Sequence, residues 1–343
     1  MPGEKLPEEF APTGPKLSRF PIRPAPAVKP RLLADEARFA ARLALLAGGA
    51  ELAAWIWFAR LLAHRGPAWA AVAFALSRAL RPFWSWLGAR LRRGVVAFVL
   101  LAMSLLVQGF AAMSFADALG AVAASLPAVA DLCAAAMADA ITVERRAAAY
   151  SWLDMAQGLG CGLGLAIGVA EPRLAPLLGT AALLVGSLGV PDLRDRGTPR
   201  TTWPSRVRLE VLRTPLAGHL ALAAAVGGGC AAAAAVRSSW GLWAVLPPLL
   251  GMAAAARGEA AARNALVVPR ALAVIGGVGL VLRQVAPPAA IGVGLFALGG
   301  LCAALPGAVA RGAGEMERAV ASSLAWSALA LGAGVGLACS ALA

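Results

Sequence analysis

The sequence predicts an all-α membrane protein that crosses the bilayer many times and consists of two pseudo-symmetric helical halves. Composition is the first reason: 60% of the residues are hydrophobic, only 14% are charged, and the mean hydropathy is +0.73. Soluble domains carry about 25% charged residues. The other two reasons are a series of apolar segments of spanning length and an internal repeat.

Apolar segments of roughly 20 residues are long enough to cross a bilayer, and they follow a polar start of the chain. Residues 1–42, rich in Pro and basic residues, predict a cytoplasmic tail. In the first half, 43–190, we expect spans at 43–63, 67–87, 95–115, 118–139, 147–169 and 174–190. A polar cytoplasmic linker follows at 191–213. In the second half, 214–343, we expect spans at 216–236, 239–256, 265–283, 287–310 and 319–341, giving about 11 transmembrane helices.

Two segments 172 positions apart carry the repeat, Arg146–Gly168 and Arg318–Ser340, and without a gap 11 of their 23 positions are identical. The identities include the leading Arg and three glycines spaced by two, 160, 162 and 164 against 332, 334 and 336. Such a repeat indicates two related membrane halves, which is an architecture of transporters. Because it aligns the fifth span with the eleventh, it predicts a sixth span of the second half after Ala343, and the sequence does not contain one.

The net charge of +13 would suggest nucleic-acid binding in a soluble protein, but here the basic residues fall in alternate loops. Arg90, Arg92, Arg93, Arg145 and Arg146 lie in loops on one side, whereas the opposite loops hold single arginines. By the positive-inside rule, we expect the N-terminus in the cytoplasm and no nucleic-acid partner. The heavy use of Ala, Arg and Gly suggests a high-GC bacterial genome, and we therefore expect the protein in a bacterial inner membrane.

The five cysteines all lie in apolar segments, and none has metal-ligand spacing. The sequence contains no phosphate-binding loop and no nucleophile constellation. We therefore expect no catalytic residues, no metal site and no cofactor, and a protein that is not an enzyme.

Residues Asp139–Gly168 resemble the loop 4–5 and helix 5 signature of the major facilitator superfamily. The resemblance is carried by Asp139, by Arg146 seven residues later, and by the Gly-rich helix that follows. Leu165 stands where the antiporter form of the motif has Pro. Gly88, Arg92 and Arg93 resemble a remnant of the family's loop 2–3 signature without its Asp. The resemblance implies a divergent member without the twelfth helix that moves a small solute between two helical halves.

The resemblance also implies roles for two sets of residues. Loop residues that would hold a gate are Gly88, Arg92, Arg93, Asp139, Arg146 and Arg318; the alternative for the arginines is that they only fix the topology. Helix-interface glycines are Gly160, Gly164, Gly168, Gly332 and Gly336, which let another helix approach closely. The resemblance places helices 5 and 11 at the boundary between the halves; the alternative is ordinary tight packing.

Ionisable residues within spans are costly and are functional hypotheses by default. Candidates for substrate binding or proton coupling are Glu51, Asp131, Asp154 and Gln157. A carboxyl group in a cavity can load and release a proton near neutral pH. The alternatives are that Glu51 pairs with Arg60 and that Asp131 lies nearer a helix end. Arg78 and Arg81 are expected to snorkel to the interface.

Two functions fit these observations. The first is a secondary transporter that moves a small, lipophilic solute by alternating access, with proton coupling, in a lipid bilayer. The second is a non-transporting structural or assembly subunit of a larger membrane complex, which the degraded loop motifs and the apolar second half also fit.

Overall fold

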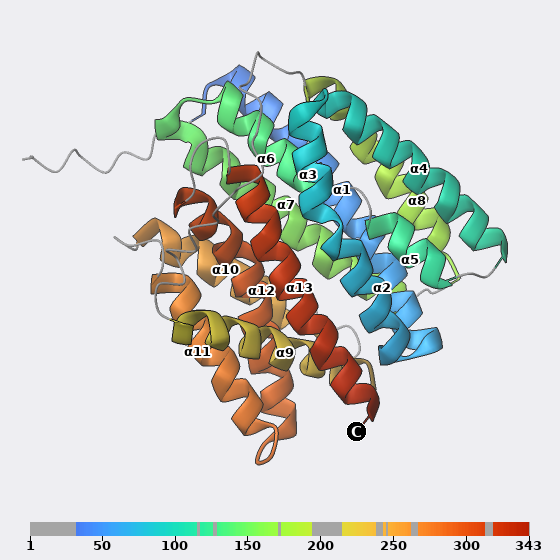
Figure 1. Cartoon of the computed structure of the whole chain (residues 1–343), viewed down its shortest axis with the longest axis vertical. Helices are drawn as coiled ribbons and strands as arrows, with labels where there is room; N and C mark the ends of the chain where they lie inside the picture. The colour runs from blue at the N-terminus through green and yellow to red at the C-terminus, as the bar shows by residue number, and fades with distance from the viewer. Residues whose placement is uncertain are drawn as a thin grey trace, which may run out of the picture. The chain divides into compact units, whose positions relative to one another are not determined.

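Two sets of α-helices make up the structure, a computed structural model shown in Figure 1. It describes residues 32–342 except 115–116, 126–128, 171–172, 194–214, 238–242, 245, 262–266 and 313–317. All regular structure in the described residues is helical. The expected tail up to residue 31 and nearly all of the expected linker lie outside them.

The described residues of the first half contain eight α-helices for the six expected spans. They are α1 (Ala34–Arg65), α2 (Pro67–Ala79), α3 (Arg81–Arg90), α4 (Arg93–Ser114), α5 (Asp117–Ser125), α6 (Val129–Ala140), α7 (Val143–Ala170) and α8 (Ala175–Ser187). Helix α1 starts earlier than the expected span at 43. The expected spans 67–87 and 118–139 each correspond to two consecutive helices.

Proline explains the break between α2 and α3. Pro82 lacks the N–H group that would donate to the carbonyl of Arg78 in a continuous helix. The Ser327 hydroxyl donates to this carbonyl instead, at 2.6 Å. The break brings Arg78, in the last turn of α2, and Arg81, at the start of α3, into the protein interior.

Among the described residues of the second half there are five α-helices, one for each expected span: α9 (Pro215–Arg237), α10 (Leu246–Ala261), α11 (Val267–Leu282), α12 (Pro287–Gly312) and α13 (Arg318–Leu342). Helices α9 and α12 begin with Pro, whose fixed φ and missing N–H suit the first helical position. The two copies of the sequence repeat lie on α7 and α13.

Equivalent helices of the two halves pack in equivalent ways. Helix α1 packs along α7, and α9, the first helix of the second half, packs along α13. Across the halves, α2 contacts α13 and α7 contacts α10. Helices α2 and α10 belong to the second and eighth spans, and α7 and α13 to the fifth and eleventh. Because these spans are equivalent in the two halves, exchanging the halves turns one contact into the other. The structure thus has the predicted pseudo-symmetry, while the exact boundaries of the halves stay a prediction.

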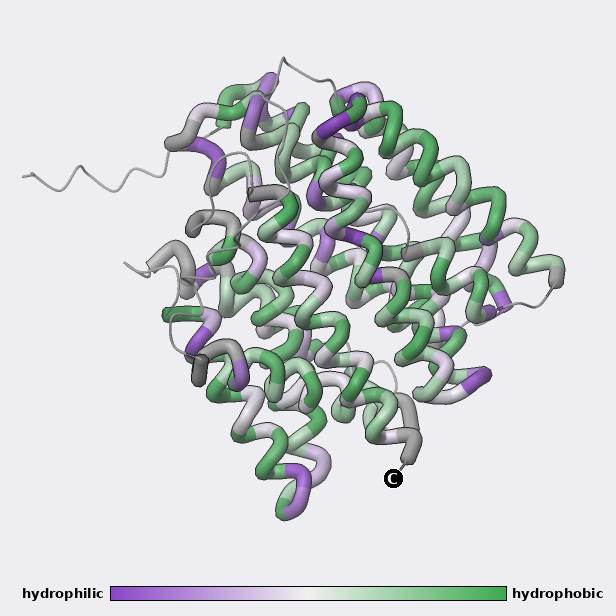
Figure 2. Tube along the Cα trace, in the orientation of Figure 1, coloured by the Kyte–Doolittle hydropathy of each residue, from purple (hydrophilic) through white to green (hydrophobic). Residues whose placement is uncertain are grey.

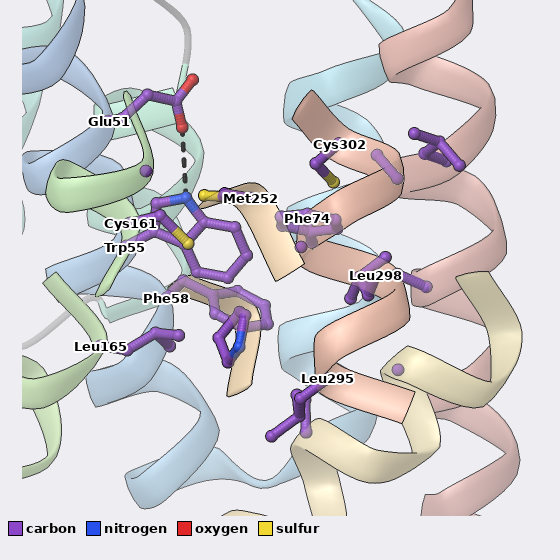
Figure 3. Close-up of a pocket in the computed structure, with 18 of the residues that line it drawn as sticks. Glu51, Trp55, Phe58, Phe74, Cys161, Leu165, Met252, Leu295, Leu298 and Cys302 are labelled. Atoms are coloured by element: carbon purple, nitrogen blue, oxygen red, sulfur yellow. Dashed lines mark hydrogen bonds between the residues drawn. The ribbon is translucent and has the colours of Figure 1, made fainter. Parts of the chain in front are cut away.

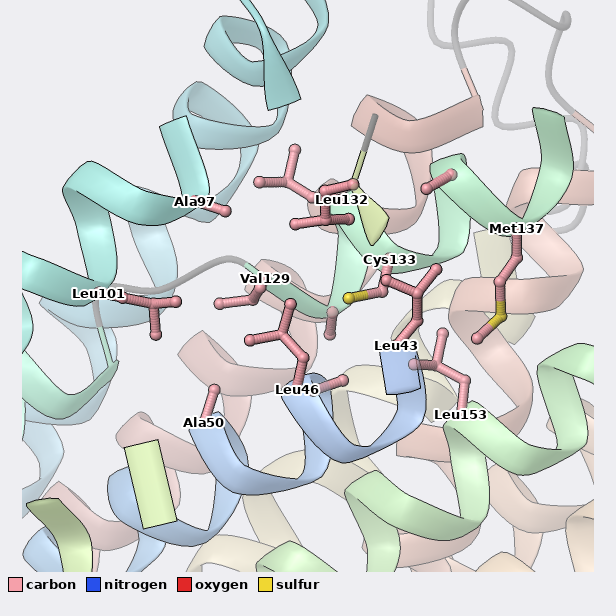
Figure 4. Packing of buried hydrophobic residues seen from close by; sticks show 14 of the residues in the cluster. Leu43, Leu46, Ala50, Ala97, Leu101, Val129, Leu132, Cys133, Met137 and Leu153 are labelled. Carbon is pink, nitrogen blue, oxygen red and sulfur yellow. The ribbon is translucent and has the colours of Figure 1, made fainter. Parts of the chain in front are cut away.

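Each half has its own apolar core. In the first half, Leu43 and Leu46 of α1 meet Leu132 and Cys133 of α6 and Leu153 of α7, as Figure 4 shows. In the second half, the core centres on Leu272, Leu301 and Leu329. Cys133 is fully buried, in agreement with its reading as a small hydrophobic residue.

Large apolar side chains also cover the outward faces of the helices. Helix α4 exposes Phe98, Leu106, Phe110 and Met113, and in Figure 2 hydrophobic residues run along most of the helices, with hydrophilic residues at many of their ends. Exposed apolar surface of this extent marks a membrane-facing region. By length and composition, five segments among the described residues can cross a bilayer: Ala34–Arg65, Arg93–Met113, Asp117–Met137, Pro287–Pro306 and Val320–Ser340. The protein is a multi-pass membrane protein.

The repeated glycines hold these helix pairs together. A Cβ atom on Gly164 would lie 2.7 Å from the carbonyl oxygen of Leu52, and one on Gly168 would lie 2.5 Å from that of Ile56. In the second half, a Cβ on Gly332 would lie 2.9 Å from the Cβ of Ala225. Gly160 abuts α1 and Gly336 abuts α9 in the same way. These five glycines therefore face helices of their own half, as in the tight-packing alternative, and not the opposite half.

Two other glycines on these helices face the opposite half. A Cβ on Gly158 of α7 would lie 2.5 Å from Sδ of Met252 on α10. A Cβ on Gly334 of α13 would lie 3.4 Å from the carbonyl oxygen of Ala71 on α2. The contacts across the halves are thus looser, or end on a flexible side chain, whereas the nearest contacts of Gly160, Gly164, Gly168 and Gly336 within each half are with backbone atoms.

We expect the Gly164→Ala substitution to destabilise the protein. The added methyl group meets the backbone of α1, and overpacking of this kind costs about 1–3 kcal/mol, more than the roughly 1 kcal/mol gained in helix propensity. Gly277→Ala on α11 is the matched control, because nothing lies within 4 Å of the added Cβ. Thermal unfolding in detergent should show a lower midpoint for the first variant only; equal midpoints would contradict the proposed role of Gly164.

Candidate functional site

A pocket of about 1360 Å³, counted with its open part, lies between the two halves. Its wall is formed by residues of α1, α2 and α7 from the first half and of α9, α10, α12 and α13 from the second. In Figure 3, Glu51 and Trp55 lie on one side, and Leu295, Leu298 and Cys302 lie on the other. The pocket therefore lies where relative movement of the halves would change its access.

Most of the pocket wall is apolar or aromatic. Trp55, Phe58 and Phe74 form an aromatic cluster with ring centroids 5.0–5.5 Å apart. Met252 and Leu298 lie in the wall contributed by the second half. Ligand pockets of this kind bind through apolar contacts and use a few polar groups for orientation.

Three of the four candidate residues contribute polar groups to this wall. Glu51 of α1 and Asp154 and Gln157 of α7 all line the pocket. Asp131 of α6 does not line it, but lies behind the wall and is buried. The structure therefore brings the candidates to one region, with Asp131 connected to Glu51 through Arg81.

Glu51 is held by three donors. Arg78 donates from Nη1 and Nη2 to its two carboxylate oxygens, at 3.0 and 2.8 Å. The indole Nε1 of Trp55 donates to Oε2 at 3.2 Å, the contact drawn in Figure 3. Nη1 of Arg81 lies 3.7 Å from Oε1, which is an ion pair without a hydrogen bond. The carboxylate thus forms a bidentate pair with one arginine and lies close to a second.

Asp131 is the second counter-ion and links the two halves. Its Oδ2 accepts hydrogen bonds from Nε of Arg81 at 2.7 Å, from the Ser323 hydroxyl at 2.7 Å and from the Ser85 hydroxyl at 3.3 Å. Ser323 belongs to α13, so the carboxylate accepts donors from both halves. The Arg81 guanidinium also stacks over the ring of Trp326 on α13, 5.0 Å from its centroid.

The four charged side chains form what we call the charge cluster: Glu51, Arg78, Arg81 and Asp131. All four are at most 9% exposed. Two positive and two negative charges balance, which is required of ions buried away from water. The prediction that Arg78 and Arg81 snorkel to the interface is wrong, because buried carboxylates are within their reach.

A separate buried ion pair lies further along α1. Nε of Arg60 donates to Asp117 at 2.8 Å, and Nδ1 of His64 lies 3.3 Å from the same carboxylate. The alternative that Arg60 pairs with Glu51 is therefore wrong. This pair does not contribute to the pocket wall.

The residues of the two loop motifs have separate surroundings. Arg93 forms an ion pair with Asp139, which joins the start of α4 to the end of α6. Nε of Arg146 donates to the carbonyl of Ile141 at 2.9 Å. Gly88 packs against Leu132, and Arg92 is exposed. Arg318 is the first residue of α13, and its side chain lies outside the described residues, as does that of Glu144, an expected partner of Arg146.

No group of three or more His, Cys, Asp or Glu side chains among the described residues could hold a metal ion. Sequence reasoning did not find Phe58, Phe74, Ser323 or Trp326, which surround the pocket and the charge cluster. Two signals for the charge cluster were present in the sequence. One is Pro82, and the other is that acids and arginines are equal in number when the first, second and fourth expected spans are taken together.

Comparison with known proteins identifies the fold. No protein-family model matches the chain, and no curated protein matches its sequence. A crystal structure of the human organic anion transporter MFSD10 (TETRAN) matches with a TM-score of 0.64 over 88% of this chain and 92% of that chain, at 17% sequence identity. At 17% sequence identity, this structural similarity shows that the two proteins share a fold. The chain therefore has a divergent major-facilitator-like fold, as the resemblance implied.

We expect the Asp131→Asn substitution to destabilise the protein by about 3–5 kcal/mol, because it leaves the buried Arg81 without its nearest counter-ion. Asp35→Asn is the control, because the Asp35 carboxylate is 97% exposed and its pair with Arg38 is weak. Chemical unfolding in detergent measures both. An Asp131→Asn protein as stable as the control variant would show that the charge cluster is not needed for the fold.

Proposed function

We propose that the protein is a secondary transporter that moves a small, lipophilic solute by alternating access. The observation that carries this proposal is the position of the pocket between the halves, with an apolar and aromatic wall and a few polar groups. A site at the boundary of two related halves can open to either side when the halves rock.

The packing supports such a movement. Backbone meets backbone within each half, at Gly164 and Gly168 and at Gly336, so each half can move as a unit. Across the halves, α7 meets α10 through the flexible side chain of Met252, which allows adjustment. The similarity to a structure named as an organic anion transporter also supports a transporter.

The proposal includes an orientation and a location. The distribution of arginines over the loops favours a cytoplasmic N-terminus and linker. The composition favours a bacterial inner membrane. The assembly-subunit alternative has no comparable observation among the described contacts, and the following experiment distinguishes it from transport.

Labelling of Cys161 tests alternating access. Cys161 lines the pocket, so a variant that keeps only this cysteine should react with a membrane-impermeant maleimide in both right-side-out and inverted vesicles. The reason is that the pocket opens to each side in turn. A variant that keeps only Cys133, which is fully buried in the first core, is the control and should stay unlabelled. Labelling of Cys161 from one side only would favour a static subunit.

A further inference from the structure

The charge cluster has donor groups without acceptors. Nε of Arg78 and Nη1 of Arg81 are buried and have no hydrogen-bond partner among the residues that the structure describes. The two arginine side chains are only 5% and 3% exposed. Buried donors without acceptors are uncommon and costly, and donors on two adjacent guanidinium groups match an anion with two or more oxygens.

Both arginines lie directly behind the pocket wall. The Arg78 guanidinium lies over the ring of Phe74, 5.6 Å from its centroid, and that of Arg81 lies over Trp326. Both rings line the pocket, and so does Glu51, which is bound to Arg78. A group that displaced the Glu51 carboxylate would therefore reach both arginines from the pocket.

The two counter-ions differ in how firmly they are held. Asp131 lies outside the pocket wall and accepts two hydroxyl donors in addition to Arg81. Glu51 lies in the wall, and within the described part of the chain its one donor besides the arginines is Trp55, on the next turn of its own helix. Glu51 is thus the counter-ion that a ligand can replace.

We propose that the pocket takes a lipophilic monoanion whose charged group replaces Glu51 on Arg78 and Arg81, while the Glu51 carboxylate takes up one proton from water. The proposal deepens the proposed function and rests on it. The anion brings one negative charge and the proton one positive charge, so the net charge of the site is unchanged. The apolar part of the ligand lies against Trp55, Phe58 and Phe74.

Charge balance makes the two binding events depend on each other. An anion without a proton adds an uncompensated charge to a buried site, and a proton without an anion leaves an arginine in excess; both are costly. Each ligand therefore strengthens the binding of the other by the same factor. The consequence is symport of one proton with one anion.

Other ionisable groups around Glu51 must be considered as proton acceptors. Helices α2 and α3 contribute Arg78 and Arg81, which stay charged. The remaining groups are Asp131 on α6, Asp154 and Cys161 on α7 and Cys302 on α12. The polar groups of α13 here, Ser323, Ser327 and Trp326, do not titrate, and Asp117 of α5 pairs with Arg60. Asp154 is the main competitor, because it is a carboxylate in the same pocket wall.

Binding of 1-naphthoate to the purified protein tests the proposal, with the neutral 1-naphthamide as a probe of similar shape. Between about pH 5.5 and 7.5, where 1-naphthoate stays ionised, its Kd should rise about tenfold per pH unit, as expected for one linked proton. The amide should bind more weakly and without this pH dependence. In weakly buffered solution, binding of 1-naphthoate should take up one proton, as read with an indicator dye.

Variants assign the proton. Glu51→Gln should bind 1-naphthoate with a Kd that no longer changes with pH, and should take up no proton. Asp117→Asn, which removes a buried carboxylate outside the pocket, should keep the wild-type pH dependence. Loss of the pH dependence in Asp154→Asn but not in Glu51→Gln would overturn the assignment of Glu51.

The outcomes separate this proposal from the proposed function. If 1-naphthamide binds and is transported as well as 1-naphthoate, with no proton uptake by the wild type, the anion proposal fails and the transporter proposal stands. If Cys161 is labelled from one side only and neither probe binds, both proposals fail. If the Glu51→Gln protein does not fold, the proton uptake of the wild type still decides between coupled and uncoupled binding.

Discussion

The arrangement of helices around the pocket depends on the neutral charge cluster buried between α1, α2, α3 and α6. Its two arginines cannot stay in the protein interior without Glu51 and Asp131, because an unpaired buried ion costs several kcal/mol. The break at Pro82 brings the arginines inward, and Ser327 of α13 occupies the carbonyl that the break leaves without its helical donor. One helix irregularity thus creates the site for the charges and attaches the second half to it.

A second constraint is the close approach of α1 to α7 and of α9 to α13. Gly164 and Gly336 occupy positions where a side chain would overlap the backbone of the neighbouring helix. These close contacts leave little room for the two helices of each pair to shift against one another. When the halves are stiff, a change in the few contacts that cross between them moves whole helices and not single side chains.

Much of the fold could be predicted from the sequence, because hydropathy gives the spans and the gapless repeat aligns the fifth span with the eleventh. The candidates Glu51, Asp154 and Gln157 could be found because polar groups in apolar segments are costly. The partners of Arg78 and Arg81 could not, since a pairing depends on distances between spans. The helix that each glycine contacts could not be predicted either. The spacing of the glycines shows that another helix approaches α7 closely, but not that this helix is α1.

The position of the charge cluster connects access to occupancy. Asp131 accepts donors from α3 and α13, so the charge cluster of the first half lies at the back of the pocket wall and is also bonded to the second half. Any ligand that changes the contacts of Glu51 also changes the charge balance seen by Arg81 and, through it, by Asp131. Hydrogen bonds to a carboxylate are strong because the acceptor is charged, so the link between Asp131 and Ser323 responds to that balance. The pocket wall and this contact between the halves thus share one set of charges, so a change in the charges at one of them is felt at the other.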